Sequence, residues 1–206
     1  MDYKRVTIDT YNKSAQSMAE HFQAYATGTA LLEITKALEL AGGRTDYRVI
    51  EIGCGAGKDA AAIVKRVAWY EGFDPSEKLL DIARQHVKGA SFVCTDALRY
   101  DYPRDVDIVF AFASMLHLDK NDFAAVCKKV AAALRPGGIL CMTLKEADAY
   151  GDTLQEDEFG KRQFYFYNPV LVRELAGPAF TQVYETHERV GPKQKPWFTT
   201  MLQRSK

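Results

Sequence analysis

The fold is decided by the stretch Val49-Ile50-Glu51-Ile52-Gly53-Cys54-Gly55-Ala56-Gly57-Lys58-Asp59, in which an apolar segment runs into a turn with three glycines. Glycines in such a turn permit positive φ angles and let the backbone approach a ligand closely. The free N–H groups at the start of a following helix bind polar ligand atoms. This order of strand, glycine turn and helix is typical of nucleotide-type binding sites.

The spacing of the glycines separates the classes of nucleotide site. The dinucleotide pattern G-x-G-x-x-G would place its third glycine at position 58, where this chain has Lys58, and the P-loop pattern does not match either. Glu51 stands two residues before the turn. A carboxylate there would repel a pyrophosphate but would suit a ligand that carries an ammonium and a sulfonium group.

Short apolar runs alternate with amphipathic stretches after residue 47, which predicts a parallel α/β sheet with helices on both faces. The predicted strands are 47–52, 68–73, 90–94, 106–113 and 138–144, and the predicted helices between them are 57–66, 76–87 and 121–134. Asp119 is a plausible N-cap for the last of these helices. A short helix over 169–175 and a hairpin-like pair of strands, 181–190 and 197–203, are predicted to follow.

Two segments flank this alternation. Residues 13–41 carry apolar residues at helical spacing, which predicts two helices broken near Thr27-Gly28 within an N-terminal helical cap over 1–45. Residues 146–158 hold six acids and no basic residue, so we expect a solvated, mobile loop. The aromatic run 164–167 then predicts a strand or lid with one wet face, which makes 145–168 an insertion that combines an acidic loop with an aromatic lid.

Composition limits the partners of the chain. The 206 residues contain 27 Lys plus Arg and 27 Asp plus Glu, so no global charge favours nucleic acid or an anionic membrane. No repeat or linker marks a boundary, and we expect one domain over 1–206. The four cysteines form no CxxC pair, which argues against a zinc ribbon or redox dithiol and predicts no metal site. With a polar N-terminus and no apolar run of about 18 residues, a cytoplasmic protein without a membrane span is expected.

Three acidic positions carry a family resemblance. The pattern E-x-G-x-G-x-G at 51–57 resembles the first motif of class I S-adenosylmethionine-dependent methyltransferases. Asp74 in Gly72-Phe73-Asp74-Pro75-Ser76 is similar to the family's ribose-binding acid at the end of the second strand. Asp96 is similar to the acid after the third strand that contacts the adenine amine.

Further segments extend the resemblance to residues 10–204. Residues 106–117 resemble the fourth strand with its active-site loop, and 134–140 resemble the turn before the fifth strand. Tyr11-Asn12-Lys13-Ser14-Ala15 is similar to the N-terminal cap of the family, and 197–203 to its final antiparallel strand. The resemblance implies a Rossmann-like, doubly wound sheet of seven strands, mostly parallel, with an antiparallel final strand.

The resemblance also implies a cofactor and a reaction. S-adenosyl-L-methionine is expected as methyl donor, with S-adenosyl-L-homocysteine as product and a small molecule as acceptor through O, N or S. The expected cofactor-binding residues are Tyr11, Glu51, Gly53, Cys54, Gly55, Gly57, Asp74, Pro75, Ser76, Asp96, Ala97, Ala113 and Met115. The loop after the fourth strand lacks the Asn/Asp-Pro-Pro-aromatic pattern of amide or exocyclic amine methylation and the Pro-Cys pair of cytosine-C5 enzymes.

His117 is the expected catalytic residue, because it follows the fourth strand and its ordinary pKa of about 6.5 suits a general base. His117→Ala is therefore predicted to lower turnover while leaving cofactor affinity intact. His117, Arg162, Tyr165 and Tyr167 are the expected substrate contacts. Tyr11 has two interpretations, packing of the cap or a ring that closes over the sulfonium by cation–π attraction.

Plainer interpretations stay open beside these. The glycines are compatible with a simple tight turn, Asp74 with an N-cap followed by Pro75, Asp96 with a turn-forming acid, and His117 with a packed side chain. Two other functions also remain: a module that binds the cofactor without turnover, and a nicotinamide-dependent oxidoreductase. Lys58 and Glu51 count against the oxidoreductase.

Overall fold

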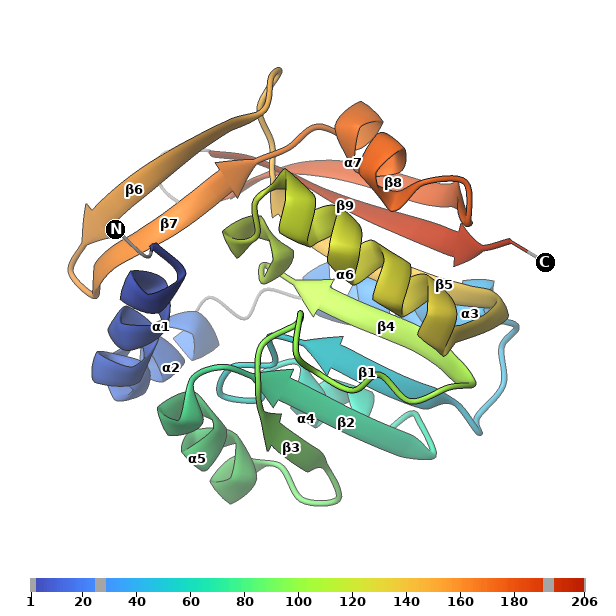
Figure 1. Cartoon of the computed structure of the whole chain (residues 1–206). Helices are drawn as coiled ribbons and strands as arrows, with labels where there is room; N and C mark the ends of the chain where they lie inside the picture. The colour runs from blue at the N-terminus through green and yellow to red at the C-terminus, as the bar shows by residue number, and fades with distance from the viewer. Residues whose placement is uncertain (1–2, 25–28, 191–194, 206) are drawn as a thin grey trace.

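A seven-stranded sheet in the order β3-β2-β1-β4-β5-β9-β8 forms the centre of the computed structural model, which describes residues 3–24, 29–190 and 195–205 (Figure 1). The strands are β1 Arg48–Ile52, β2 Trp69–Asp74, β3 Ser91–Cys94, β4 Val106–Phe112, β5 Leu134–Lys145, β8 Phe180–Val190 and β9 Lys195–Arg204. Neighbouring strands run parallel except for β9, which is antiparallel to both β5 and β8. The predicted Rossmann-like, doubly wound sheet with an antiparallel final strand is confirmed.

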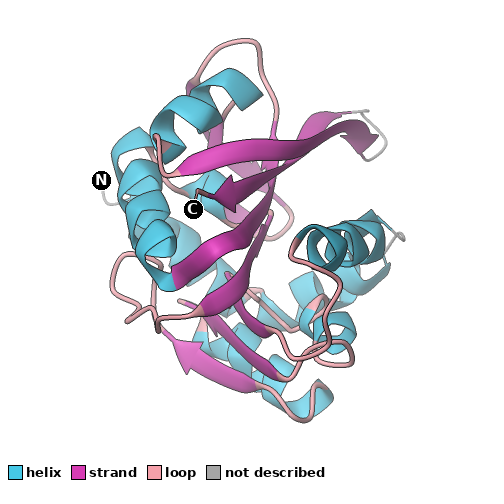
Figure 2. Ribbon diagram, turned by 90° about the vertical axis from the view of Figure 1, so that its right-hand side faces the viewer, coloured by secondary structure: helices cyan, strands magenta, loops and turns pink. Residues whose placement is uncertain are grey.

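Helices lie on both sides of the sheet, as the edge-on view in Figure 2 shows. They are α1 Tyr3–Lys13, α2 Ala15–Ala24, α3 Thr29–Leu40, α4 Ala60–Ile63, α5 Glu77–His86, α6 Lys120–Ala133 and α7 Pro169–Ala176, with a 3-10 turn at Met115–His117. Each face of the sheet packs into its own apolar cluster. In β1, for example, Ile50 joins one cluster and Val49 the other. Burial on both faces explains why the central strands are almost continuously apolar.

Local sequence explains where several helices begin. Asp119 caps α6, as predicted, because its carboxylate accepts hydrogen bonds from the backbone N–H groups of Asn121 and Asp122. The helix predicted over 57–66 is wrong in length, since only the four residues of α4 are helical. Gly57 has a φ of +79°, which no right-handed helix can include.

The prediction of a mobile acidic loop over 146–158 is wrong. Strand β6, Gly151–Asp157, pairs antiparallel with β7, Gly160–Phe166, and the two form a separate hairpin. Three of the six acids have partners on β7: Glu156 forms an ion pair with Lys161, Asp157 forms one with Arg162, and Asp152 accepts a hydrogen bond from Gln163. Charge counted along the sequence misses such cross-strand pairing. The predicted strand within the aromatic run 164–167 is present in β7.

Helix α1 lies within the segment 1–45 that was expected to form a helical cap, and it begins well before residues 13–41, over which the apolar spacing predicts helices. The predicted break near Thr27-Gly28 lies outside the described residues. Three side chains in α1 or directly after it hold the helix in place: Thr10 Oγ1 donates to Lys161 O at 2.7 Å, Ser14 Oγ donates to Phe159 O at 2.8 Å, and Asn12 Oδ1 accepts from Ser76 Oγ at 3.0 Å. Tertiary contacts of this kind stabilise a short polar helix whose own periodicity is weak.

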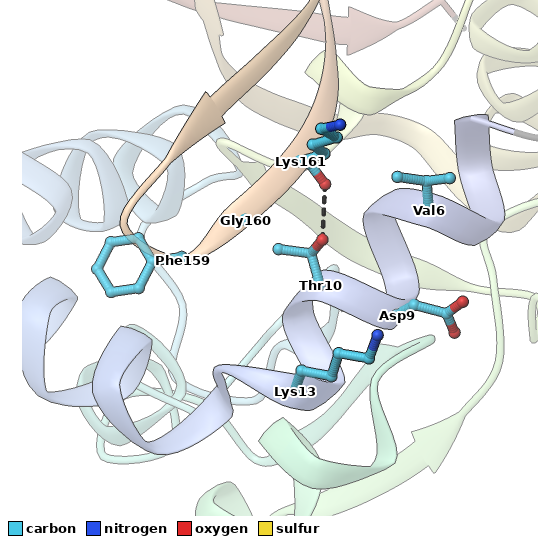
Figure 3. Close-up of a pocket in the computed structure, with 7 residues that line it drawn as sticks. All are labelled: Val6, Asp9, Thr10, Lys13, Phe159, Gly160 and Lys161. Carbon is cyan, nitrogen blue, oxygen red and sulfur yellow. Dashed lines mark hydrogen bonds between the residues drawn. The ribbon is translucent and has the colours of Figure 1, made fainter.

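Helix α1 therefore spans from the β6–β7 hairpin to α5. In Figure 1 the arrowheads of β1, β2 and β4 point toward the side of the molecule where α1 and the hairpin lie. The outer surface between α1 and the hairpin holds a hollow of about 320 Å³, lined by Val6, Asp9, Thr10, Lys13, Phe159, Gly160 and Lys161 (Figure 3). No predicted site residue lines this hollow. Among the described residues, no helix combines the length and apolar character that a membrane crossing requires.

Candidate active site

The glycine turn after β1 is fixed against the end of β2. Gly53 N–H and Cys54 N–H both donate to Phe73 O, at 2.8 and 3.1 Å. Gly53 has a φ of +68°, and a Cβ added there would lie 2.4 Å from the Cβ of Ser114. Conformation and space therefore both require glycine at this position, which brings the turn against the loop that follows β4.

Asp74, at the carboxyl end of β2, connects this turn to α5. Its Oδ2 accepts from Gly55 N–H at 3.1 Å and its Oδ1 accepts from Ser76 N–H at 2.8 Å. Burial raises the pKa of Asp74 to about 6, although the two backbone donors oppose that shift. Since a carboxylate oxygen accepts more than one hydrogen bond, Asp74 retains capacity for a ligand hydroxyl.

Glu51 lies beneath the glycine turn, 2% exposed. Tyr70 donates its hydroxyl proton to Glu51 Oε2 at 2.5 Å. Burial, followed by the nearby charge of Asp59, raises the pKa of Glu51 to about 8. The carboxyl is therefore mostly protonated at neutral pH, and pairing with a cationic ligand requires it to lose that proton.

The remaining residues expected at the cofactor differ in their surroundings. Asp96 closes its own turn, because Oδ1 accepts from Leu98 N–H at 2.9 Å and from Arg99 N–H at 3.0 Å. The buried side chains are those of Cys54, Ser76 and Ala97. The carbonyl of Pro75 accepts from Cys94 Sγ. Met115 lies wholly in the core, which argues against direct contact with a ligand.

The loop after β4 is strained next to the glycine turn. Ala113 has a φ of +50°, a left-handed conformation that costs a residue with a side chain about 1 kcal/mol. The hydroxyl of Ser114 is buried without a hydrogen-bond partner, and its Cβ faces Gly53. Strain and an unpartnered polar group at the end of a central strand are features of functional sites.

A second group of side chains gathers around His117. Its Nδ1 lies 2.6 Å from Gln163 O, which only accepts, so Nδ1 carries the proton. Its Nε2 therefore accepts from the Tyr11 hydroxyl, 2.9 Å away. Desolvation lowers the pKa of His117 to about 4, so the imidazole is neutral at physiological pH.

Of the predicted substrate contacts Arg162, Tyr165 and Tyr167, only Arg162 on β7 lies in this group of side chains. Arg162, 7% exposed, has its guanidinium carbon 5.6 Å from the Tyr11 ring centroid and 5.3 Å from that of Phe164. Tyr165 instead stacks on Tyr150. Tyr167 is fully buried and donates to Leu118 O at 2.5 Å, which argues against direct contact with a substrate.

Lys145, at the carboxyl end of β5, is a member of this group that sequence reasoning missed. It is 8% exposed, and its Nζ lies 3.3 Å from the ring centroid of Phe164. Desolvation, helped by the neighbouring Lys195 and Arg162, lowers its pKa to about 7. The available signal was a lysine directly after a buried apolar run, at the sheet edge where α/β ligands bind.

Comparison with known protein families gives a match over the central part of the chain. A family model described as a methyltransferase domain matches residues 49–138. The chain is 34% identical over 104 residues to methyltransferase GfsG of Streptomyces halstedii, covering 47% of this chain and 37% of that protein. It is 30% identical over 101 residues to a trans-aconitate 2-methyltransferase of Rhizobium rhizogenes, covering 48% and 39%. The chain thus spans well under half the length of these relatives.

Solved structures extend the likeness of fold to nearly the whole chain. Magnesium protoporphyrin IX methyltransferase (ChlM) from Synechocystis PCC 6803, with bound SAH, superposes with a TM-score of 0.73 at 15% identity, covering 99% of this chain and all of that one. At that identity the likeness is one of fold. Residues 49–138 therefore match a methyltransferase domain, and nearly the whole chain shares the fold of a solved methyltransferase.

Proposed function

We propose that this protein transfers a methyl group from S-adenosylmethionine to an oxygen, nitrogen or sulfur atom of a small molecule. The observation that carries the proposal is the hydrogen bond from Gly55 N–H to Asp74, which fixes a glycine turn and an acid side by side. They lie at the carboxyl ends of β1 and β2, next to the point where the strand order reverses between β1 and β4. Ligands of open α/β sheets bind at such switch points.

The residues around this point suit the proposed donor. The glycine turn lies directly against the loop after β4, and the unpartnered Ser114 hydroxyl in that loop offers a polar contact. We assign the ribose hydroxyls to Asp74, the adenine to Asp96 and Ala97, and the ammonium group to Glu51. Bound S-adenosylmethionine supplies an already activated methyl group, so the protein mainly has to align the acceptor and exclude water.

We assign His117 the role of general base for acceptors that carry a proton. The imidazole is neutral, and its Nε2 lone pair is already a proton acceptor toward Tyr11. The sequence prediction assumed the ordinary pKa of about 6.5; burial lowers it to about 4, which makes His117 a weaker base than expected. Deprotonation of a bound acceptor would therefore run to Nε2 directly, once Tyr11 moves aside, or through the Tyr11 hydroxyl. The hydrogen bond from Nδ1 to Gln163 O keeps the ring oriented for either route.

The proposed acceptor is a small molecule rather than nucleic acid, because acidic and basic residues are equal in number and give no general attraction to phosphate. We place the activity in the cytoplasm, since widely spaced cysteines without a CxxC pair are typical of a reducing compartment.

Isothermal titration tests the cofactor. We expect S-adenosylmethionine and S-adenosylhomocysteine to bind at micromolar concentration, NAD to give no heat, and Asp74→Ala to weaken both positive titrations. Binding of NAD without the sulfonium ligand would overturn the proposal. Transfer of labelled methyl to any member of a small-molecule panel then separates an enzyme from a binding module, and His117→Ala should lower that transfer without changing cofactor affinity.

A further inference from the structure

We propose that the methyl acceptor carries a carboxylate group and that Lys145 and Arg162 bind it. The inference rests on the proposed function and adds the chemical class of the acceptor. It starts from two basic side chains that are buried beside His117 and Tyr11. Burial deprives both of the water that would hydrate their charge at the surface.

Lys145 is the first of these side chains. It is 8% exposed, and none of the described acidic residues forms an ion pair with it. Its Nζ lies 3.3 Å from the ring centroid of Phe164 and 5.8 Å from that of Trp197, and it donates to the amide oxygen of Gln155 at 3.4 Å. An aromatic face and one long hydrogen bond satisfy an ammonium group only in part, because it has three donors.

Arg162 is the second, and it also retains unused donors. Its guanidinium pairs with Asp157, but its buried Nε has no hydrogen-bond partner. The guanidinium lies near the Tyr11 ring and interacts with the Tyr11 hydroxyl. Two buried cations therefore share one acid. Because buried charge is costly without a partner, the cluster is completed by one additional anion.

The aromatic ring of Phe164 joins the two cations to the proposed base. Lys145 Nζ and the Arg162 guanidinium both lie over this ring, and the His117 ring centroid is 4.9 Å from it. An anion held by the cations would therefore lie close to His117. Lys145 ends β5, which β4 and β1 separate from β2 with Asp74 and from β3, after which Asp96 lies; Arg162 belongs to the separate β6–β7 hairpin. That position assigns the anion to the acceptor rather than to the donor.

Carboxylate is the favoured anion. The planar guanidinium fork matches the two oxygens of a carboxylate, and the ammonium of Lys145 adds a point charge. Asp157 and Asp152 lie on the facing strand β6, and Asp152 accepts from Gln163. Their charges oppose the binding of a phosphate dianion more strongly than that of a single carboxylate.

The test is a titration of the protein saturated with S-adenosylhomocysteine, at pH 8, with butyrate, benzoate, succinate and tricarballylate, and with succinamide as the neutral counterpart. We expect at least one carboxylate to bind and the amide to be silent. Lys145→Met should weaken that binding by at least about tenfold, as expected for one partner of a buried charge pair. Lys145→Arg should retain it. Lys161→Met, which removes an exposed lysine next to Arg162, is the matched control and should change nothing.

Proton uptake on anion binding distinguishes a lysine that binds the anion from one that only supports the structure, because a purely structural lysine would take up no proton. The charged groups that influence Lys145 are Lys195, Arg162 and Asp157. With a pKa of about 7 in the free protein, Lys145 is protonated in about a tenth of molecules at pH 8. Binding of an anion raises that fraction, so titrations in buffers of different ionisation enthalpy should show uptake approaching one proton, and Lys145→Met should abolish it.

The outcomes separate this inference from the proposed function. If S-adenosylhomocysteine binds but no carboxylate binds in a Lys145-dependent way, the inference is overturned and the proposed function stands. If Lys145→Met and Lys145→Arg fold normally and lose S-adenosylhomocysteine binding, the cations serve the donor's own carboxylate and the inference is again overturned. If the wild-type protein does not bind S-adenosylhomocysteine, the proposed function itself fails.

Discussion

The two sides of the site are built in different ways. On the cofactor side, at the ends of β1–β3, the bonds at the glycine turn and at Asp96 join residues close in sequence: Gly55 to Asp74, 19 positions apart, and Asp96 to Leu98, two apart. The bond from Ser76 to Asn12 of α1, 64 positions apart, is the exception. On the acceptor side, the hydrogen bond between Tyr11 and His117 joins residues 106 positions apart, and the one from Gln163 N–H to Thr7 Oγ1 joins residues 156 positions apart. Short motifs therefore describe the first side, whereas only the folded chain assembles the second.

The two sides also differ in charge. The cofactor side buries acids whose pKa values are raised, to about 8 for Glu51 and about 6 for Asp74. The acceptor side buries bases whose pKa values are lowered, to about 7 for Lys145 and about 4 for His117. Each side thus has an excess of one kind of titratable group, and ligands that carry the opposite charge should change protonation in opposite directions.

The largest effect is expected from Gly53→Ala. The new Cβ would meet Ser114 at 2.4 Å in a backbone with positive φ, so the glycine turn has to shift. We expect the free energy of unfolding to fall by about 3 kcal/mol. Titration should show loss of S-adenosylhomocysteine affinity by about a hundredfold or more, equivalent to about 2.8 kcal/mol.

Gly89→Ala is the matched control for this substitution. Gly89 also has a positive φ, +79°, but a Cβ there would meet nothing within 4 Å. It should cost about 1 kcal/mol of stability and leave affinity unchanged. Equal loss of affinity in the two variants would show that the contact with Ser114 does not shape the cofactor side.

Asp74→Asn should have the next largest effect. The amide keeps the shape of the carboxylate but turns one of two acceptors for backbone N–H into a donor, facing Gly55 or Ser76. We expect affinity for S-adenosylhomocysteine to fall by about ten- to a hundredfold, as for a hydrogen bond to a charged group. Wild-type affinity should also fall below pH 6, as Asp74 becomes protonated, and the variant should lose that dependence.

Substitution of Glu51 should have a smaller effect on affinity but a clear effect on the number of protons released when the ligand binds. With a pKa of about 8, Glu51 is protonated in about nine tenths of free molecules at pH 7. Pairing with the ligand's ammonium group should release that proton, opposite in sign to the uptake expected at Lys145. Titration in two buffers measures the release, which Glu51→Gln should abolish with about a fivefold loss of affinity.

The same raised pKa has a consequence for stability. Between pH 4.5 and 8 the unfolded chain ionises Glu51 while the folded protein keeps it protonated, so the free energy of unfolding falls as pH rises. Glu51→Gln should remove that part of the pH dependence and stabilise the protein at neutral pH. Because the lowered pKa values of His117 and Lys145 shift stability in the opposite direction, the test is the difference between the two proteins: the same pH dependence of the denaturant midpoint in wild type and Glu51→Gln would contradict the protonated state of the buried carboxyl.

The sequence predicts the cofactor side of the site better than the acceptor side. The glycine spacing, the acids at strand ends and the apolar strands predict the sheet and the positions of Gly53, Asp74 and Asp96, because these depend on local conformation and on strand order. Lys145 was missed, and Tyr167 was expected at the substrate but lies in the core. Which face of β7 a residue occupies, and which partner α1 finds, depend on tertiary packing that periodicity does not report.

The smallest effect is expected from Thr10→Val, which probes how α1 closes the acceptor side. The substitution keeps the buried shape and removes the hydrogen bond from Thr10 Oγ1 to Lys161 O, worth about 1 kcal/mol (Figure 3). Because a loss of about 1 kcal/mol makes local opening about five times more frequent, amide hydrogen exchange in α1 should be about fivefold faster. The affinity for S-adenosylhomocysteine should stay within about twofold of wild type. Ser17→Ala, which removes an exposed bond to Ser14 O, is the control. If Thr10→Val weakens cofactor binding as strongly as Asp74→Asn, α1 acts on the cofactor side as well, and the division into two separately built sides does not hold.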